Sequence, residues 1–266
     1  MIDLHCHILP GIDDGAPDME TALRMANMAV ADGIAVTACT PHIMPGVYDN
    51  APSAIRQQAE LLRRSLSEAA IPLDIVVGSD AHMRPDFAAA IAEDRILTVN
   101  NSRYVLFEPP HNLAPLRIEE FLFDIQMAGY VPVLTHPERL LWIERQYSLI
   151  TRLAHAGVWM QITAGSLTGL MGKRPKYWAE RMVSEGLVHI LASDAHNCTT
   201  RPPMLSEARA AAARLVGSEE ATHLVVTRPL GMVNNADPTT LPAPEAVPQE
   251  PERTSLWRRV IDVVRA

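Results

Sequence analysis

The chain alternates short runs of apolar residues with longer segments in which apolar residues recur every three or four positions. The short runs are rich in β-branched residues and predict strands, whereas the longer segments are typical of amphipathic helices. The predicted strands lie near residues 2–7, 34–40, 73–77, 104–107, 131–134, 158–162 and 188–192. The predicted helices lie near residues 19–32, 51–70, 116–128, 147–156, 176–185, 204–216 and 219–226.

This alternation of strand and helix, repeated seven times, indicates an α/β fold with a parallel sheet covered by helices. Seven units in 266 residues favour a closed or nearly closed barrel, and a doubly wound open sheet is the alternative. Hydrophobic residues make up 48% of the chain, which is enough for one large core.

The C-terminal end of the chain differs in composition from the rest. Residues 236–253 contain five prolines and no apolar periodicity, which predicts an extended, mobile linker. Residues 254–266 could form a short amphipathic helix, docked on its own domain or a partner subunit, or lying against a membrane surface or a membrane-bound partner. We therefore divide the chain into a barrel, residues 1–235, and a linker with a short helix, residues 236–266. This organisation is compatible with an oligomer.

Histidines and carboxylates stand at the C-terminal ends of the predicted strands. His5 and His7 are two residues apart in the first strand, so they share one face, opposite Leu4 and Cys6. The later strands run into further residues of the same kinds: His42, Asp80, His82, Glu108, His136, Asp194 and His196. In a parallel barrel the C-terminal strand ends meet at one rim, where active sites lie.

Burying so many ionisable side chains without partners is costly, and a cluster of cations removes that cost. The sequence therefore predicts a polynuclear metal centre. Imidazole and carboxylate ligands without a cysteine motif favour an open catalytic site for Mn, Fe or Zn. Such ions suit phosphoester hydrolysis, because they lower the pKa of water and neutralise negative charge. Arg139 and Arg201 flank the ligands and could bind phosphate oxygens, although an arginine alone is more often a surface ion-pair residue.

Charge and motif content exclude several function classes. The formal net charge of −8 argues against binding nucleic acid by bulk attraction to its backbone. A cysteine-dependent phosphatase needs arginine six positions after the nucleophile, where this chain has Ile12, Pro45 and Met204. No G-x-x-x-x-G-K-[ST] loop is present. The widely spaced cysteines, the lack of a membrane-length apolar run and the lack of a basic-then-apolar N-terminus favour a reducing cytoplasm.

Six motifs occur in order along the chain: D-L-H-C-H-I-L-P-G-I-D-D-G, T-P-H, G-S-D, F-E-P, H-P-E-R and S-D-A-H-N. Over roughly residues 1–235 they resemble the polymerase and histidinol phosphatase (PHP) superfamily, and within it the bacterial metal-dependent protein-tyrosine phosphatases of capsular and exopolysaccharide operons. The resemblance implies a distorted (β/α)7 barrel with a manganese-preferring, trinuclear site. It also implies removal of phosphate from tyrosines of a partner autokinase that controls polysaccharide synthesis and export. A metal-activated hydroxide would attack phosphorus directly, without a cysteine intermediate.

The resemblance also implies roles for residues at matching positions. The metal ligands would be His5, His7, His42, Asp80, Glu108, His136, Asp194 and His196. The catalytic residues would be Asp14, which orients water or protonates the leaving group, Arg139 and Arg201, which hold phosphate, and His196. Asp80 departs from the pattern, because the family commonly has glutamate there. Aspartate is one methylene shorter, so Asp80 could shift an ion, bind it through water, or recruit His82.

Other polar residues near this set have more than one interpretation. Asp3 could hold a ligand imidazole by its other ring nitrogen, or face solvent. Asp13 and Asp14 could both be turn residues after Pro10, and the resemblance favours Asp14 over Asp13 for the site. His111 is interpreted as a loop histidine.

Two alternative functions remain open at this point. One is another phosphoesterase of the same superfamily, acting on histidinol phosphate or on a nucleic-acid end. The other is a regulatory scaffold that binds a phosphorylated partner without catalysis. The five tyrosines lie at positions 48, 104, 130, 147 and 177, outside the C-terminal tail, so a phosphotyrosine substrate is expected in trans.

Overall fold

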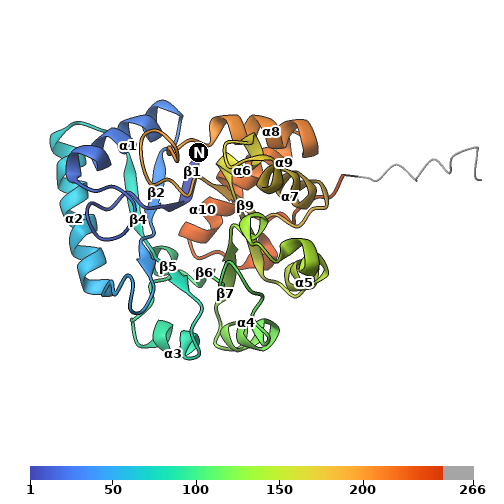
Figure 1. Cartoon of the computed structure of the whole chain (residues 1–266). Helices are drawn as coiled ribbons and strands as arrows, with labels where there is room; N and C mark the ends of the chain where they lie inside the picture. Colours follow the sequence, from blue (N-terminus) through green and yellow to red (C-terminus); the bar gives the residue numbers. More distant parts are fainter. Residues whose placement is uncertain (248–266) are drawn as a thin grey trace, which may run out of the picture.

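All seven predicted strands are present in the computed structural model, which describes residues 1–247 (Figure 1). They are β1 Ile2–Cys6, β2 Val36–Cys39, β4 Asp74–Val77, β6 Tyr104–Glu108, β7 Val131–Thr135, β8 Trp159–Thr163 and β9 Ile190–Ala192. Two further short strands, β3 His42–Ile43 and β5 Asp80–His82, continue β2 and β4 after breaks of two residues. Because β3 and β5 contain polar residues and are very short, the hydrophobic pattern does not predict them.

The strands form a distorted barrel with seven strand positions. One sheet has the order β1-β2-β4 and the other the order β3-β5-β6-β7-β8-β9, and each of these neighbouring pairs is parallel. The broken strands β2–β3 and β4–β5 contribute to both sheets and join them. The ring closes between β9 and β1, where His7 donates its backbone N–H to Ala195 at 2.9 Å and Asp194 donates its own to His5 at 2.8 Å. The barrel prediction is confirmed, and the open-sheet alternative does not apply.

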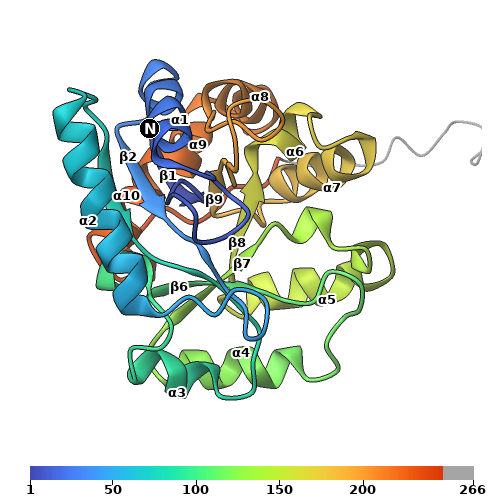
Figure 2. The same ribbon diagram turned by 60° about the vertical axis from the view of Figure 1, so that its left-hand side comes forward.

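Helices surround the strands (Figures 1 and 2). They are α1 Met19–Ala31, α2 Pro52–Glu68, α3 Phe87–Ala92, α4 Ile118–Met127, α5 Ile143–His155, α6 Ala164–Thr168, α7 Lys173–Ser184, α8 Ser206–Val216, α9 Ser218–Thr222 and α10 Arg228–Val233. α3, α6 and α10 are too short to show a clear helical periodicity. The helix predicted near residues 219–226 is part of a longer segment, in which α9 and α10 flank a π-helical stretch, His223–Thr227.

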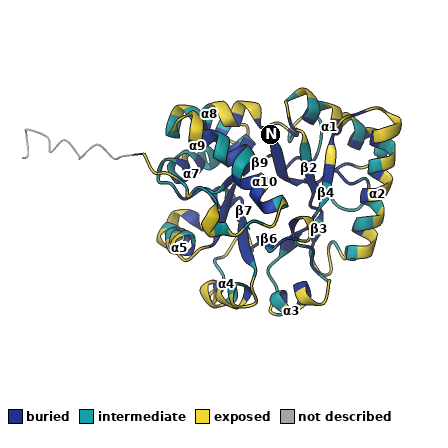
Figure 3. Ribbon diagram, turned by 180° about the vertical axis from the view of Figure 1, so that it is seen from behind, coloured by how far each residue is buried: buried dark blue, intermediate teal, exposed yellow. Residues whose placement is uncertain are grey.

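Apolar residues fill both the space between helices and strands and the inside of the barrel. The inner cluster consists of Ile2, Leu4, Ala38, Val99, Tyr104, Leu106, Val131, Val133, Trp159, Ile190 and Met232. Met232 belongs to α10, so α10 closes the end of the barrel at which the strands begin. Figure 3 shows the same division, with buried strands and with exposed residues on the outward faces of the helices. The opposite end of the barrel is therefore the end left for polar side chains.

Strict alternation along the first strand predicts that Leu4 and Cys6 share a face, and this prediction is wrong. Leu4 packs in the inner cluster, whereas Cys6 and Ile8 belong to the outer cluster, between strands and helices. The pairing of β1 with β2 shifts register between Asp3 and Cys6, and such a shift changes the face on which the following residues lie. This irregularity lets Leu4 and His5, which are adjacent in sequence, both contribute to the inside of the barrel.

Residues 236–247 lie against the barrel. Tyr104 donates its hydroxyl to the carbonyl oxygen of Ala236 at 3.0 Å. Val247 donates its backbone N–H to Ser184 at 2.9 Å. The first part of the predicted linker, residues 236–247, therefore contacts the barrel, and its mobility stays a prediction. The rest of the predicted linker and the predicted helix 254–266 lie outside the described residues. Within residues 1–247, no helix is both long and apolar enough to cross a membrane.

Candidate metal centre

The structure brings the predicted ligands together at the end of the barrel where the strands terminate. Four groups of side chains each offer ligand atoms that lie within 4.8 Å of one another. These groups are His7–Asp14–His42–His196, His5–His7–Asp80, His42–His82–Glu108 and Glu108–His111–His136. They include every predicted ligand except Asp194, which contacts two of the histidines directly. The groups share members, so they form one continuous cluster.

Asp194 joins the two histidines of the first motif. Its Oδ1 lies 3.4 Å from His5 Nε2 and 3.5 Å from His7 Nε2, and these two nitrogens are 3.1 Å apart. The opposite ring nitrogens are held by hydrogen bonds. His5 Nδ1 donates to Gln161 Oε1 at 2.9 Å, and His7 Nδ1 donates to Asp13 Oδ2 at 2.7 Å. Donation through Nδ1 leaves the lone pair on Nε2, which is the form of histidine that binds a metal.

The close approach of His5 and His7 requires a positive charge. Two nitrogen lone pairs 3.1 Å apart repel each other unless a proton or a cation lies between them. Burial lowers the pKa of His5 to about 3. Burial also acts to lower the pKa of His7, but its hydrogen bonds with Asp13 and Asp194 outweigh burial and raise it to about 10. A divalent cation between the two ring nitrogens removes the repulsion of their lone pairs.

Asp80 and His42 present unpaired atoms to each other in the middle of the cluster. His42 Nδ1 and Asp80 Oδ2 are 3.5 Å apart and buried, and neither has a hydrogen-bond partner among the described residues. The other oxygen of Asp80 accepts a hydrogen bond from the Thr135 hydroxyl at 3.4 Å, which fixes the carboxylate. Burial and the neighbouring Glu108 raise the pKa of Asp80 well above its usual range. A cation reverses both effects, so this donor set fits a divalent metal ion.

Glu108 is surrounded by four imidazoles. His82 Nε2 lies 2.7 Å from one carboxylate oxygen, and His111 Nε2 lies 2.6 Å from the other. His42 Nδ1 and His136 Nε2 each lie 3.6 Å from an oxygen of Glu108. Although burial raises the pKa of Glu108, hydrogen bonds from His111 and His82 hold it well below its usual range. His111 is thus part of the cluster, which its interpretation as a loop histidine does not anticipate.

The two aspartates of the first loop take different positions. The Asp13 side chain is buried; besides holding His7, it accepts the backbone N–H of His42 at 3.1 Å. The Asp14 side chain is 46% exposed, and its Oδ1 lies 3.4 Å from His196 Nε2 and 3.7 Å from His42 Nε2. Asp14 therefore lies at the open edge of the cluster, whereas Asp13 positions one of its histidines.

Arg139 and Arg201 both contact Asp194. Arg139 Nη1 and Arg201 Nη2 donate to Asp194 Oδ2, the second at 2.5 Å. Because Oδ1 of the same carboxylate faces His5 and His7, Asp194 connects the two guanidinium groups to the imidazole cluster.

Two residues of the cluster have unusual backbone conformations. His136 and Asp194 follow β7 and β9 with φ angles of 35° and 51°. Positive φ is uncommon outside glycine and costs on the order of 1–3 kcal/mol. Such strain persists only where the surrounding structure fixes it, and it concentrates at functional sites.

Sequence reasoning missed Gln161 and misassigned Asp3. Gln161 lies in β8, and no local pattern marks it as the partner of His5. Asp3 is fully buried, and its carboxylate accepts hydrogen bonds from the backbone and the hydroxyl of Ser193 at 2.9 and 2.5 Å. Asp3 therefore holds β9 against β1. Both interpretations of Asp3 are wrong, because its partner is a serine rather than an imidazole or water.

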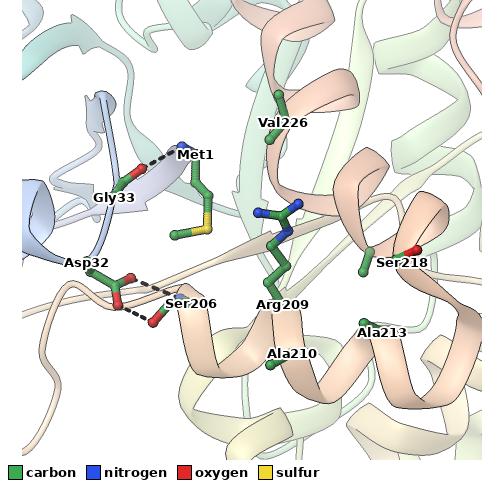
Figure 4. A pocket seen from close by; sticks show the side chains of 10 residues that line it. Met1, Asp32, Gly33, Ser206, Arg209, Ala210, Ala213, Ser218 and Val226 are labelled. Carbon is green, nitrogen blue, oxygen red and sulfur yellow. Dashed lines mark hydrogen bonds between the residues drawn. The ribbon is translucent and has the colours of Figure 1, made fainter.

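The larger cavities lie outside the cluster. Figure 4 shows one of about 480 Å³ near the beginning of β1, beside Arg209, where Met1 donates to Gly33 and Ser206 donates to Asp32. Another, of about 470 Å³, lies between the segments that follow β5 and β6 and helix α4. None of the candidate ligands lines either cavity.

Comparisons with known proteins cover nearly the whole barrel. The family model for capsular polysaccharide synthesis proteins CpsB/CapC matches residues 1–234. The tyrosine-protein phosphatase YwqE of Bacillus subtilis (strain 168) is 40% identical over 219 residues, which is 82% of this chain and 86% of YwqE. The tyrosine-protein phosphatase CpsB of Streptococcus pneumoniae is 29% identical over 238 residues, which is 86% of this chain and 96% of CpsB.

A solved structure extends the similarity to three dimensions. It comes from crystal structures of YwqE and of S. pneumoniae CpsB, described as unique metal-dependent tyrosine phosphatases. It matches with a TM-score of 0.87 and 37% identity, over 94% of this chain and 100% of the solved chain. Residues 1–234, which the family model matches, contain all the segments that carry the candidate ligands. The chain therefore belongs to the CpsB/CapC family of capsular polysaccharide synthesis proteins.

Proposed function

We propose that the protein is a metal-dependent protein-tyrosine phosphatase. Its substrate is a phosphotyrosine-bearing bacterial autokinase that regulates capsular or exopolysaccharide synthesis and export. The observation that carries the proposal is the cluster of imidazoles and carboxylates joined through Asp194 to two arginines. The activity named for YwqE and CpsB supports the reaction, and membership of a capsular polysaccharide family supports the substrate.

The donor set supports two or three divalent ions, for which we propose manganese, with iron or zinc as alternatives. The residues that would hold them are His5, His7, His42, Asp80, Glu108, His136, Asp194 and His196. When bound, such ions lower the pKa of a water molecule and neutralise charge on the phosphate.

The residues of the chain bind the phosphate and direct the proton. Hydrolysis forms a bond between the water oxygen and phosphorus, breaks the P–O bond to tyrosine, and leaves a proton on the phenolic oxygen. Asp14, half-exposed at the edge of the cluster, is placed to orient the water or to protonate the leaving oxygen. His196 Nδ1 donates to the Asp194 backbone carbonyl at 3.0 Å, so its Nε2 points to the same edge. Arg139 and Arg201 supply planar donors to the phosphate oxygens.

The same proposal places the protein in the cytoplasm, acting on a protein rather than on nucleic acid. All three cysteines are free, and Cys6 and Cys39 are buried, which supports a reducing compartment. The net charge of −8 supports a protein substrate over a polynucleotide.

Side-by-side turnover of three substrates tests the proposal. The purified protein is supplied with Mn²⁺ and then with a chelator, using a phosphotyrosine peptide, histidinol phosphate and single-stranded DNA. We expect turnover of the phosphotyrosine peptide that the chelator abolishes. Preferential turnover of either other substrate would identify another phosphoesterase, and turnover of none would support a non-catalytic scaffold.

Arg139→Ala separates phosphate binding from metal binding. We expect turnover to fall about a hundredfold, because a donor to the transition state is lost, while the bound metal stays unchanged. His5→Ala should instead empty the site, because His5 is a proposed ligand. Metal analysis of both variants would contradict these roles if Arg139→Ala lost the metal and His5→Ala kept it.

A further inference from the structure

The tetrapeptide S-D-A-H occurs twice in the chain, at residues 79–82 and 193–196. Residues 80–82 of the first copy form β5, and the second copy directly follows β9. Both copies lie at the end of the barrel that carries the cluster. In the second copy, Asp194 and His196 both lie in the cluster. In the first copy, Asp80 is a proposed ligand, whereas His82 contacts Glu108.

His82 of the first copy points into the same cluster as Asp80. The two residues are two apart in β5, so they share a face, as the histidines of an H-x-H pair do. His82 is the register partner of Glu108 on β6, and its Nε2 lies 2.7 Å from Glu108 Oε2. Its ring centroid lies 5.4 Å from that of His42. The ligand atoms of His42, His82 and Glu108 all lie within 4.8 Å of one another.

The donor atoms near His82 are not fully paired without it, so His42 and Glu108 can share a cation with a third donor. His42 Nδ1 is buried and has no hydrogen-bond partner within residues 1–247. Asp80 Oδ2 is 3.5 Å from this nitrogen, but it is also 3.5 Å from His5 Nε2 on the other side. One short carboxylate is thus shared between two donor groups. His82 is 21% exposed, so it reaches the cluster from the solvent side, where an ion can enter.

We propose that His82 is a metal ligand, which with His42 and Glu108 holds a divalent cation. The first S-D-A-H then supplies a carboxylate and an imidazole to the centre, as the second does. This inference rests on the metal dependence in the proposed function. Because imidazole suits zinc and iron better than manganese, His82 also shifts the selectivity of this position towards zinc.

Metal binding without substrate tests the role of His82. The full chain, wild type and His82→Gln, is stripped with chelator, and binding of Zn²⁺ alone and of Mn²⁺ alone is then measured by competition with a coloured chelator and by metal analysis. We expect at least a tenfold loss of Zn²⁺ affinity for one ion in His82→Gln, with a smaller loss for Mn²⁺. Equal affinities in the two proteins would overturn the proposal.

Two controls separate ligation from hydrogen bonding to Glu108. His111→Gln removes the imidazole that contacts the other oxygen of Glu108, and His155→Gln removes an exposed histidine of α5. His155→Gln should keep wild-type metal binding, whereas His111→Gln should lose less affinity for the ion at His82 than His82→Gln does. An equal loss in His82→Gln and His111→Gln would make His82 a positioning residue only. His82→Glu restores a ligand atom, so it should bind Mn²⁺ better than His82→Gln does. Failure of this rescue would also contradict ligation.

The outcomes also separate this inference from the proposed function. A wild-type protein that binds metal through His82 but does not hydrolyse phosphotyrosine would refute the phosphatase and leave the ligand role intact. If the wild-type protein hydrolyses phosphotyrosine and the His82→Gln variant keeps wild-type metal affinity, the phosphatase proposal stands and the ligand role of His82 is refuted. A wild-type protein that binds no metal would refute both.

Discussion

Buried charged side chains lie at both ends of the barrel, and the two groups differ in how completely their polar atoms are paired. At the end where the strands begin, Arg228 donates to both oxygens of Glu220 at 2.7 Å. It also donates to the carbonyl oxygens of Pro242, Ala243 and His189. These five hydrogen bonds use all five donors of the guanidinium group.

The cluster at the other end is buried to a similar extent but is not paired in this way. His42 Nδ1, Asp80 Oδ2 and His136 Nδ1 lack hydrogen-bond partners in the part of the chain that the structure describes. Each unpaired buried group costs about 1–3 kcal/mol, so a fold keeps several of them together only for a reason. Complete pairing therefore indicates a structural ion pair, and shared incomplete pairing indicates a site that binds a cation.

Glu108→Gln should give the largest effect, confined to the metal cluster. It removes the carboxylate charge of a proposed ligand that two donor groups share, so phosphotyrosine turnover should fall at least about a thousandfold, equivalent to about 4 kcal/mol, together with the bound metal. The free energy of unfolding of the chelator-treated protein should change by no more than about 1 kcal/mol. Turnover, metal analysis and urea unfolding of the same preparations check this. If the metal-free variant is unfolded, Glu108 is needed for stability, and the distinction between a metal cluster at one end and a structural ion pair at the other is wrong.

Arg228→Met should have the opposite profile. It leaves Glu220 buried without its partner, so the free energy of unfolding should fall by about 3–5 kcal/mol. The fraction that remains folded should bind as much metal per chain as wild type. Arg214→Met, on the exposed side of α8, is the matched control and should cost less than about 0.5 kcal/mol. A comparable small loss in both variants would show that the Glu220 pair is not structural.

Glu138→Gln tests a buried carboxylate that is only partly paired, by the pH dependence of stability. Glu138 is fully buried and accepts the Thr163 backbone N–H at 3.0 Å. Burial raises its pKa from 4.5 to about 7, so its contribution to stability is full below about pH 4.5 and is lost as pH rises through about 7. Glu138→Gln should match wild type at pH 4 and be roughly 3 kcal/mol more stable at pH 9. Urea unfolding at both pH values measures this, and a difference independent of pH would count against it.

Tyr104→Phe should give the smallest effect, at the end of the barrel that Arg228 occupies. Removing the hydroxyl leaves the carbonyl oxygen of Ala236 without this donor, so unfolding should become easier by about 1 kcal/mol. Thermal unfolding of Tyr104→Phe measures this effect, and Tyr130→Phe, at a partly buried tyrosine, is the control. An unchanged midpoint would show that this contact does not stabilise residues 236–247.

The barrel and the positions of the candidate ligands were predictable because both follow from local periodicity. Apolar strand runs that lead into His42, Glu108 or Asp194 place those residues at one rim once the strands are parallel. The sequence also predicts the shared direction of His5 and His7. It could not predict the register shift that turns Leu4 inward, because the shift depends on how β1 pairs with β2.

The residues that hold the ligands in place were harder to predict, because their partners are distant in sequence. Asp13 resembles a turn residue until its contacts with His7 and His42 are seen, and Gln161 is 156 residues from His5. The prolines after residue 236 predicted an extended chain, and they give no information on whether that chain packs. Arg228 and Tyr104 hold this segment against the barrel through hydrogen bonds to the carbonyl oxygens of Pro242 and Ala236.

The closure of the ring between β1 and β9 affects how the protein matures. Asp3 and Ser193, which hold these strands together, are 190 residues apart. A nascent chain leaving the ribosome therefore exposes its first histidines long before Asp194 and His196 have been synthesised. Closing a loop of this length costs chain entropy before the contacts that it forms stabilise the fold. The complete set of candidate ligands therefore exists only in a polypeptide that has been translated beyond His196 and has closed its barrel.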